Sequence, residues 1–121
     1  MPKFVTAVAC AALLIALAPA ARAQQPSHEE DVAAGHKLAL TVCSACHVVE
    51  ANQDMEPVLR PPAPTFASIA NRPAETEEAV RTFLVSTHGT LANSKNMPNP
   101  MLMDFQVRQA AAYLMSLRTA H

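Results

Sequence analysis

Two cysteines and one histidine stand close enough in the sequence to act on a single group. Residues 43–47 read Cys-Ser-Ala-Cys-His, and the third cysteine of the chain is Cys10. A disulfide across two intervening residues closes a very small loop and adds little chain-entropy stabilisation. A thioredoxin-like redox pair would need a βαβ pattern around it, which is not present here. A zinc site would need four ligands. The other histidines of the chain do not have the paired spacing of zinc ligands; they are His28, His36, His88 and His121.

The same five residues fit covalent haem attachment, for which C-x-x-C-H is the c-type signal. On a helical turn, at about 100° per residue, Cys46 lies about 60° to one side of Cys43, and His47 lies about 40° to the other. The three side chains therefore leave one face, where the thiols can add to two porphyrin vinyl groups while the imidazole reaches the iron. We predict one haem c, bound through Cys43 and Cys46, with His47 as an axial iron ligand.

The first 23 residues have the composition of a secretory signal peptide. Residues 1–23 contain 18 apolar residues, a positive charge at Lys3 and the small-x-small sequence Ala-Arg-Ala at 21–23. Their apolar run is too short to span a bilayer comfortably. Lipidation at Cys10 is not favoured, because most of the apolar stretch follows this cysteine instead of preceding it. We expect cleavage after Ala23, export to the periplasm and no transmembrane anchor in the mature chain.

Composition restricts the mature chain, residues 24–121, to a few functional classes. It carries seven Lys and Arg against ten Asp and Glu, so its net charge of −3 argues against nucleic acid or an anionic membrane as a partner. A chain of this size forms a thin core, and the mature part has four aromatic residues apart from histidine. We therefore expect a non-protein group to fill part of the interior.

The pattern of the mature chain predicts an all-α domain. We expect a flexible tail over 24–31 and one domain over 32–121, with a helical pattern that begins at about Glu29 and runs into Cys43. Four prolines between 57 and 64 exclude regular helix and central strand there, and predict a stiff loop. One short helical turn is expected over 65–70, a helix over about 76–87, a second loop over 91–100 and a last helix over about 104–118. The chain thus consists of three main helices joined by proline-rich loops.

With these elements in this order, the sequence resembles the small bacterial class I cytochromes c over most of the mature chain. The features that carry the resemblance are Gly35, the 43–47 motif, Pro-Thr-Phe at 64–66, Asn-Met-Pro at 96–98 and the segment 112–117. The resemblance implies an all-α class I cytochrome c fold around one covalent haem. The chain departs from it at Ala39, where the family often has an aromatic residue, and at Met103 in place of a Ser or Thr cap. Asp104 is therefore expected to take over the capping.

The resemblance also implies the surroundings of the iron. A ligating imidazole usually donates its other N–H to an acceptor that fixes the tautomer, and the implied acceptor for His47 is the backbone carbonyl of Pro64, with Pro62 as the fallback. The sixth ligand is expected to be Met97, which lies 50 residues after His47 in a proline-bounded loop and matches the Met-Pro pattern of the family. Met101 is second, ahead of the remaining methionines of the mature chain: Met55, Met103 and Met115.

The other polar residues are expected to be less specific. His36 and His88 are predicted to be surface residues, and His88 is the alternative axial ligand that we retain. Arg60, Arg72 and Lys95 could pair with haem propionates, but each is expected to be a solvated charge.

A soluble periplasmic electron carrier, and not an enzyme, is the function that this ligand set implies. The expected partners are redox proteins: a respiratory complex, a terminal oxidase or a periplasmic dehydrogenase. The mature chain has only two lysines, Lys37 and Lys95, so the lysine-ringed docking face of mitochondrial cytochromes is absent. The alternative is a haem c with an open iron site, acting as a peroxidase or gas-binding protein.

Overall fold

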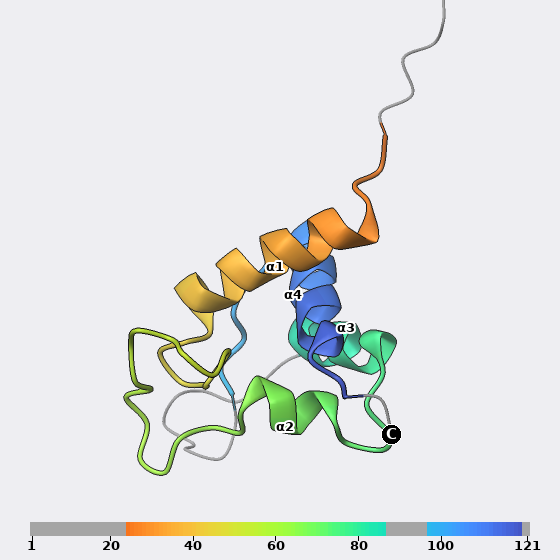
Figure 1. Ribbon diagram of the computed structural model, residues 1–121. Helices are drawn as coiled ribbons and strands as arrows, with labels where there is room; N and C mark the ends of the chain where they lie inside the picture. The colour runs from red at the N-terminus through yellow and green to blue at the C-terminus, as the bar shows by residue number, and fades with distance from the viewer. Residues whose placement is uncertain (1–23, 87–96, 120–121) are drawn as a thin grey trace, which may run out of the picture.

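Four helices form the described part of the computed structural model, which comprises residues 24–86 and 97–119 (Figure 1). They are α1 (His28–Val42), α2 (Phe66–Ala70), α3 (Glu77–Val85) and α4 (Asp104–Ser116). These two stretches contain no β-strand, so the predicted all-α class is confirmed. The predicted signal peptide and most of the loop expected over 91–100 lie outside the described residues. The same holds for four residues named above: His88, Lys95, Asn96 and His121.

Helix α1 begins earlier than the sequence suggested. Ser27 caps it: its Oγ accepts a hydrogen bond from the Glu30 N–H at 3.2 Å, and the Glu30 carboxylate accepts one from the Ser27 N–H at 2.6 Å. Residues 28–31 are therefore helical, and the predicted flexible tail over 24–31 is wrong for this part. The tail prediction missed this capping box, which lies before the apolar pattern that we used to place the helix.

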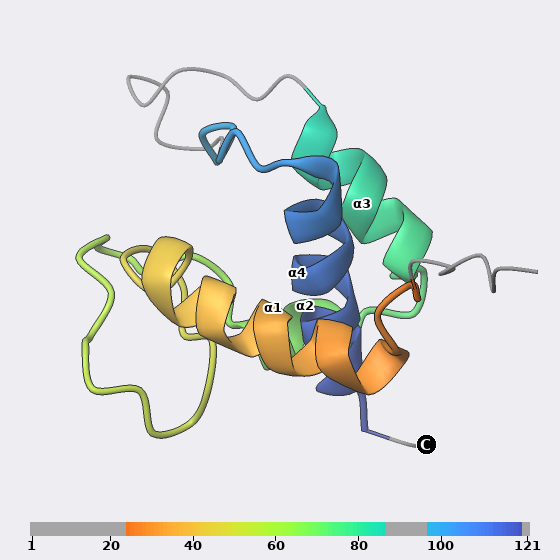
Figure 2. The same cartoon turned by 90° about the horizontal axis from the view of Figure 1, so that it is seen from above.

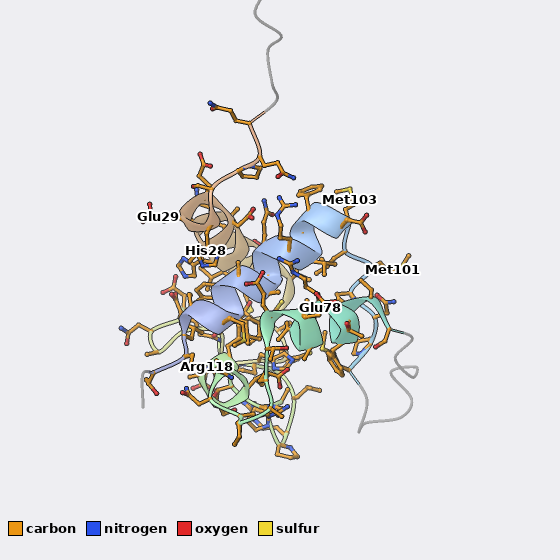
Figure 3. The ribbon with its side chains drawn as sticks, turned by 90° about the vertical axis from the view of Figure 1, so that its right-hand side faces the viewer. His28, Glu29, Glu78, Met101, Met103 and Arg118 are labelled. Atoms are coloured by element: carbon orange, nitrogen blue, oxygen red, sulfur yellow. The ribbon has the colours of Figure 1, made fainter. Side chains whose placement is uncertain are left out.

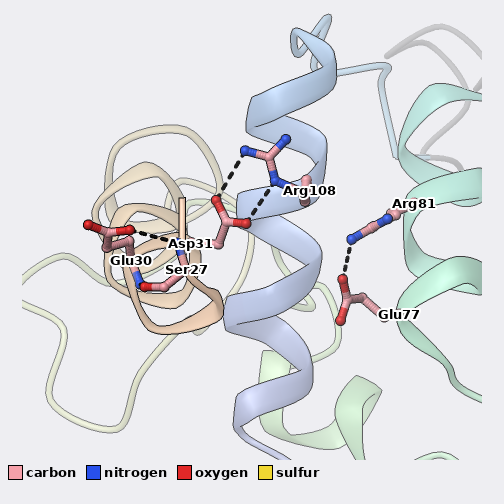
Figure 4. Close-up of polar contacts among 6 residues, drawn as sticks. All are labelled: Ser27, Glu30, Asp31, Glu77, Arg81 and Arg108. Atoms are coloured by element: carbon pink, nitrogen blue, oxygen red, sulfur yellow. Dashed lines mark hydrogen bonds and ion pairs between the residues drawn. The ribbon is translucent and has the colours of Figure 1, made fainter. Parts of the chain in front are cut away.

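The next two helices start where a threonine can cap them. The Thr65 hydroxyl accepts from the Ser68 N–H, and the Thr76 hydroxyl accepts from the Ala79 N–H, both at 3.0 Å. Helix α3 therefore begins at the predicted place, and it ends at Val85, two residues before the expected end. Glu77 and Arg81 form an ion pair one turn apart on α3 (Figure 4).

Capping of α4 differs from the expectation. Met103 occupies the N-cap position, and the Gln106 side chain accepts a hydrogen bond from the Met103 N–H at 3.0 Å. Asp104 lies in the first turn, where its charge suits the positive end of the helix, but it is not the cap. The helix ends at Ser116, before Arg118, whose guanidinium donates to the carbonyls of Ala70, Arg72 and Glu75.

The centre of the fold is the place where α1 crosses α4 (Figure 2). Gly35 lies at the crossing, and a Cβ placed on it would stand 1.9 Å from the Gln109 carbonyl oxygen and 2.8 Å from the Tyr113 Cβ. Only a glycine permits this approach of the two backbones. Apart from Tyr113, the buried residues of α1 and α4 in the core are small or medium in size: Ala39, Val107, Ala110, Ala111 and Leu114.

We predict that Gly35→Ala destabilises the folded protein by about 2–3 kcal/mol, because the added methyl group must push α1 and α4 apart. Helix propensity alone predicts the opposite sign, a gain of about 1 kcal/mol. Urea unfolding of the purified protein measures the difference. The matched control is Ala33→Gly on the exposed side of α1, which should cost about 1 kcal/mol. A more stable Gly35→Ala protein would contradict the close crossing.

An ion pair also links α1 to α4 near this crossing. Arg108 on α4 donates to both carboxylate oxygens of Asp31 on α1, at 2.7 and 3.2 Å (Figure 4). The side chain of Asp31 is only 8% exposed, so the carboxylate depends on this partner. The hydrogen bond to Asp31 is the main cause that raises the pKa of Arg108 above its ordinary value.

None of the helices in the described residues is both long and apolar enough to cross a membrane.

Candidate cofactor site

The Cys-Ser-Ala-Cys-His motif forms a tight turn that continues the direction of α1. Cys43 is the C-cap of the helix, and its carbonyl accepts from the N–H groups of Cys46 and His47 at 3.1 and 2.9 Å. The Ser44 hydroxyl donates to the Leu40 carbonyl at 2.6 Å and holds the turn against the helix. The backbone of the turn is therefore close to helical. A helical turn is the geometry from which we predicted that the two thiols and the imidazole share one face.

Neither cysteine of the turn is in a disulfide. Burial, and to a lesser extent the neighbouring Cys46, raise the pKa of the Cys43 thiol to about 11. Cysteines that act in thiol redox catalysis have a lowered pKa, because the thiolate is the reactive form. The environment of Cys43 therefore does not favour the thioredoxin-like alternative. Two unpaired thiols are the form that thioether attachment requires.

His47 is held in one orientation by its surroundings. It is 8% exposed, its Nδ1 lies 2.6 Å from the Pro64 carbonyl oxygen, and its ring packs against the edge of Phe66 at a centroid distance of 5.6 Å. A carbonyl can only accept, so Nδ1 is the donor, and in a neutral imidazole of this tautomer the lone pair is on Nε2. The hydrogen bond implied by the resemblance is thus present, with Pro64 and not Pro62 as its acceptor.

The loop after the motif is tied back to it by main-chain hydrogen bonds. The Val58 N–H donates to the Ala45 carbonyl at 2.8 Å, the Ala63 N–H to the Cys46 carbonyl at 3.1 Å, and the Phe66 N–H to the Val48 carbonyl at 2.9 Å. These contacts place the Pro64 carbonyl beside the imidazole. A proline suits this stretch because it has no N–H to satisfy.

Two residues that the sequence did not single out also hold this region. The Gln53 amide accepts from the Val49 N–H at 2.7 Å and donates to the carbonyls of His47 and Met55. The Tyr113 hydroxyl on α4 donates to the Val49 carbonyl at 2.9 Å. Burial, and then the charge of Glu50, raise the pKa of Tyr113, so the hydroxyl keeps its proton and remains a donor. No sequence signal marks either contact.

We predict that Tyr113→Phe lowers the free energy of unfolding by about 1–2 kcal/mol, because the buried Val49 carbonyl loses its side-chain donor. Thermal or urea unfolding of the purified protein measures the loss. Thr41→Ala is the control, since it removes an exposed hydroxyl that donates to the Lys37 carbonyl and should change stability by less than about 0.5 kcal/mol. Equal losses in the two variants would argue against a special role for the buried contact.

His36 differs from the surface residue that was expected. Its ring lies 4.9 Å from that of Tyr113, and its Nε2 is 2.7 Å from a Glu50 carboxylate oxygen. From its position on α1, His36 therefore packs against Tyr113 of α4. Ala39, at the position where the related family often has an aromatic residue, is fully buried.

The methionines separate into two groups by burial. Met97 and Met115 are partly buried and pack against the apolar core. Met55, Met101 and Met103 are 59, 87 and 58% exposed. Met101 has a positive φ of 52°, and its N–H donates to the Asn99 side chain at 2.8 Å in a turn after Met97. Of the methionines in loops, Met97 is thus the one directed toward the core.

Arg60 and Arg72 are exposed charges, as expected: their side chains are 67 and 53% exposed. Arg60 donates to the carbonyls of Pro57 and Leu59, and Arg72 lies 3.8 Å from Glu75. Within residues 24–86 and 97–119, no group of three His, Cys, Asp or Glu side chains could hold a metal ion.

The residues on this turn fit a covalent haem, because they supply two unpaired thiols and one oriented imidazole with a free Nε2. Large apolar side chains are also exposed on the helices. The most exposed of these on the helices are Val42, Phe83, Val85 and Phe105. A porphyrin is a flat apolar group, so it could cover side chains of this kind.

Comparisons with known proteins agree with this reading of the site. The family model described as Cytochrome c matches residues 32–118. Cytochrome c-552 of Bradyrhizobium diazoefficiens is 35% identical to the chain over 88 residues, which are 73% of this chain and 76% of that relative. No solved structure gives a significant match.

Proposed function

This chain belongs to the cytochrome c family, and on that premise we propose that it is a periplasmic one-electron carrier whose haem iron is bound by His47 and Met97. Members of the family bind haem c covalently and carry electrons. The haem would be attached through Cys43 and Cys46 and would supply the iron that changes oxidation state. Beyond what family membership shows, we propose three things: that His47 and Met97 are the axial ligands, that the protein is in the periplasm, and that it carries electrons without catalysing a reaction.

The observation that supports His47 most directly is its hydrogen bond to the Pro64 carbonyl. The bond fixes the ring and makes Nε2 the only nitrogen of the imidazole with a free lone pair. Metal-bound histidines commonly have such an acceptor behind them, which fixes the tautomer and the ring orientation. His47 can therefore keep the same position in both oxidation states, and little rearrangement would accompany electron transfer.

Met97 is proposed as the sixth ligand because it is the inward-facing methionine of a loop distant in sequence from His47. A thioether is a weak donor to ferric iron, so His/Met ligation gives a higher reduction potential than His/His ligation. Two protein ligands would leave no open position for oxygen or substrate. This is the property that separates a carrier from the peroxidase or gas-binding alternative.

The test is made on protein exported by a bacterial host that matures c-type cytochromes. We expect a coloured product whose mass equals residues 24–121 plus one haem, and whose spectrum is low-spin and cycles reversibly between two oxidation states. A mass that retains residues 1–23 would contradict the proposed signal peptide. A product that takes up an external ligand without any substitution would contradict the carrier.

A further inference from the structure

The loop over residues 48–63 carries an apolar tip that the protein leaves open to solvent. Met55, Val58 and Leu59 are 59, 70 and 43% exposed, and we call these three residues the loop patch. Pro57 between them is buried, so the chain turns inward there and outward on either side. An exposed apolar patch edged by polar residues is the kind of surface that can bind another molecule.

The loop patch is fixed to the attachment turn. The hydrogen bond from Val58 to the Ala45 carbonyl holds the tip at the turn itself, and the one from Ala63 to the Cys46 carbonyl holds the end of the loop there. The Gln53 side chain braces the beginning of the loop against the carbonyls of His47 and Met55. In Figures 1 and 2 this loop projects away from α3 and α4. A molecule that binds the loop patch would therefore lie beside the two cysteines.

The charges around the loop patch are mainly negative. Asp54 and Glu56 adjoin Met55, and Glu50 lies at the base of the loop. The cation of this segment is Arg60, which lies 3.7 Å from Glu56 and turns its Nη1 toward the carbonyls of Pro57 and Leu59. Residues 48–63 thus carry a net charge of −2 without counting histidine.

We propose that the loop patch is the docking surface for a redox protein that presents an apolar area edged by Lys and Arg side chains. The proposal rests on the electron-carrier function above. Apolar contact would supply the attraction, and the complementary charges would steer the encounter. A second copy of this chain or an anionic membrane would bring like charges against Asp54 and Glu56, so both fit less well. Such a contact is small and brief, as redox encounters require.

The experiment uses a probe with the chemistry proposed for the partner. Tris(phenanthroline)cobalt(III) is a trication with aromatic faces, and it takes one electron from the reduced protein to become cobalt(II). Ferricyanide, a trianion that also takes one electron, is the probe of opposite charge. Second-order rates are measured by stopped flow at about 0.1 M ionic strength, where charges more than about 10 Å from the probe are largely screened.

Reversal of the loop charges should reverse the preference of the protein. We expect Asp54→Lys with Glu56→Lys to slow oxidation by the cobalt complex about tenfold and to speed oxidation by ferricyanide. The matched control is Glu29→Lys with Glu78→Lys, which makes the same change in net charge on the exposed first turns of α1 and α3 (Figure 3). The control should change either rate by less than about twofold.

A second pair of variants tests the apolar part. Val58→Ser should slow oxidation of the reduced protein by the cobalt complex about threefold, because less apolar surface is buried on contact. Ala33→Ser, on the exposed side of α1, should leave the rate unchanged. Neither position contributes to the buried core, so each variant should fold, and its reduction potential is measured first so that the rates are compared at equal driving force.

The outcomes separate this proposal from the proposed function. Normal redox cycling with equal effects of the loop and control charges would overturn the docking surface alone. Wild-type protein without a reversible redox couple would overturn both. Self-association that Val58→Ser abolishes would assign the loop patch to a second copy, and binding to vesicles of anionic lipid would assign it to a membrane. Either result would replace the redox partner.

Discussion

Replacement of both Cys43 and Cys46 by alanine is expected to give an exported chain that is colourless and poorly folded. The two substitutions remove the thiols through which the haem would be attached. They should also remove a large part of the interior, because the protein alone has little with which to form one. Within residues 24–86 and 97–119, five of the twelve buried core residues are alanines, and the largest fully buried side chain is Val49.

The exposed apolar residues lead to the same expectation. Phe83 and Phe105 are 50 and 45% exposed, although aromatic side chains supply much of the burial energy of small domains. A chain of about 100 residues has a net stability of only about 5–15 kcal/mol. A covalently attached haem would bury apolar surface when the chain folds and so add to this net stability, and a chain without haem would lack that contribution.

Circular dichroism and urea unfolding measure this result. The double alanine variant should show a weak helical signal and no cooperative transition, while Ala45→Ser, an exposed substitution between the two cysteines, should retain colour and cooperativity. A compact double variant that unfolds cooperatively would show that the protein forms its core without the haem.

Replacement of Met97 by alanine is expected to open the sixth position of the iron while leaving the haem attached. The attachment residues and His47 lie on a separate part of the chain, so the purified variant should still be coloured. It should bind carbon monoxide readily in the reduced state, whereas the wild type should not. Its reduction potential should fall, because the thioether that favours ferrous iron is gone.

Met101→Ala is the matched control, since Met101 is the second candidate and is 87% exposed. This variant should retain the wild-type spectrum and exclude carbon monoxide. If it opened the iron and Met97→Ala did not, the ligand would be Met101. If the wild type itself bound carbon monoxide readily, the open-site alternative of a peroxidase or gas-binding protein would replace the electron carrier.

Features that depend on neighbours in the sequence could be predicted from the sequence. The 43–47 motif places three reactive groups on one turn because successive residues of a helical turn have fixed angular spacing. The start of α3 follows from Thr76, whose side chain reaches a backbone N–H three residues later. The acceptor behind His47 needed the resemblance as well, since residue spacing alone does not distinguish Pro64 from Pro62.

Contacts between distant segments were decided only by the tertiary structure. Asp31 meets Arg108 across 77 residues, and Tyr113 meets the Val49 carbonyl across 64. Both contacts exist because α1 and α4 approach closely at Gly35, and the depth of that approach depends on the packing of both helices together. The local pattern placed Asp31 near the start of the first helix, but nothing near it in the sequence indicates its partner Arg108. The sequence thus determined the chemistry of the attachment turn. The crossing of α1 and α4 determined the long-range contacts that stabilise the fold around it.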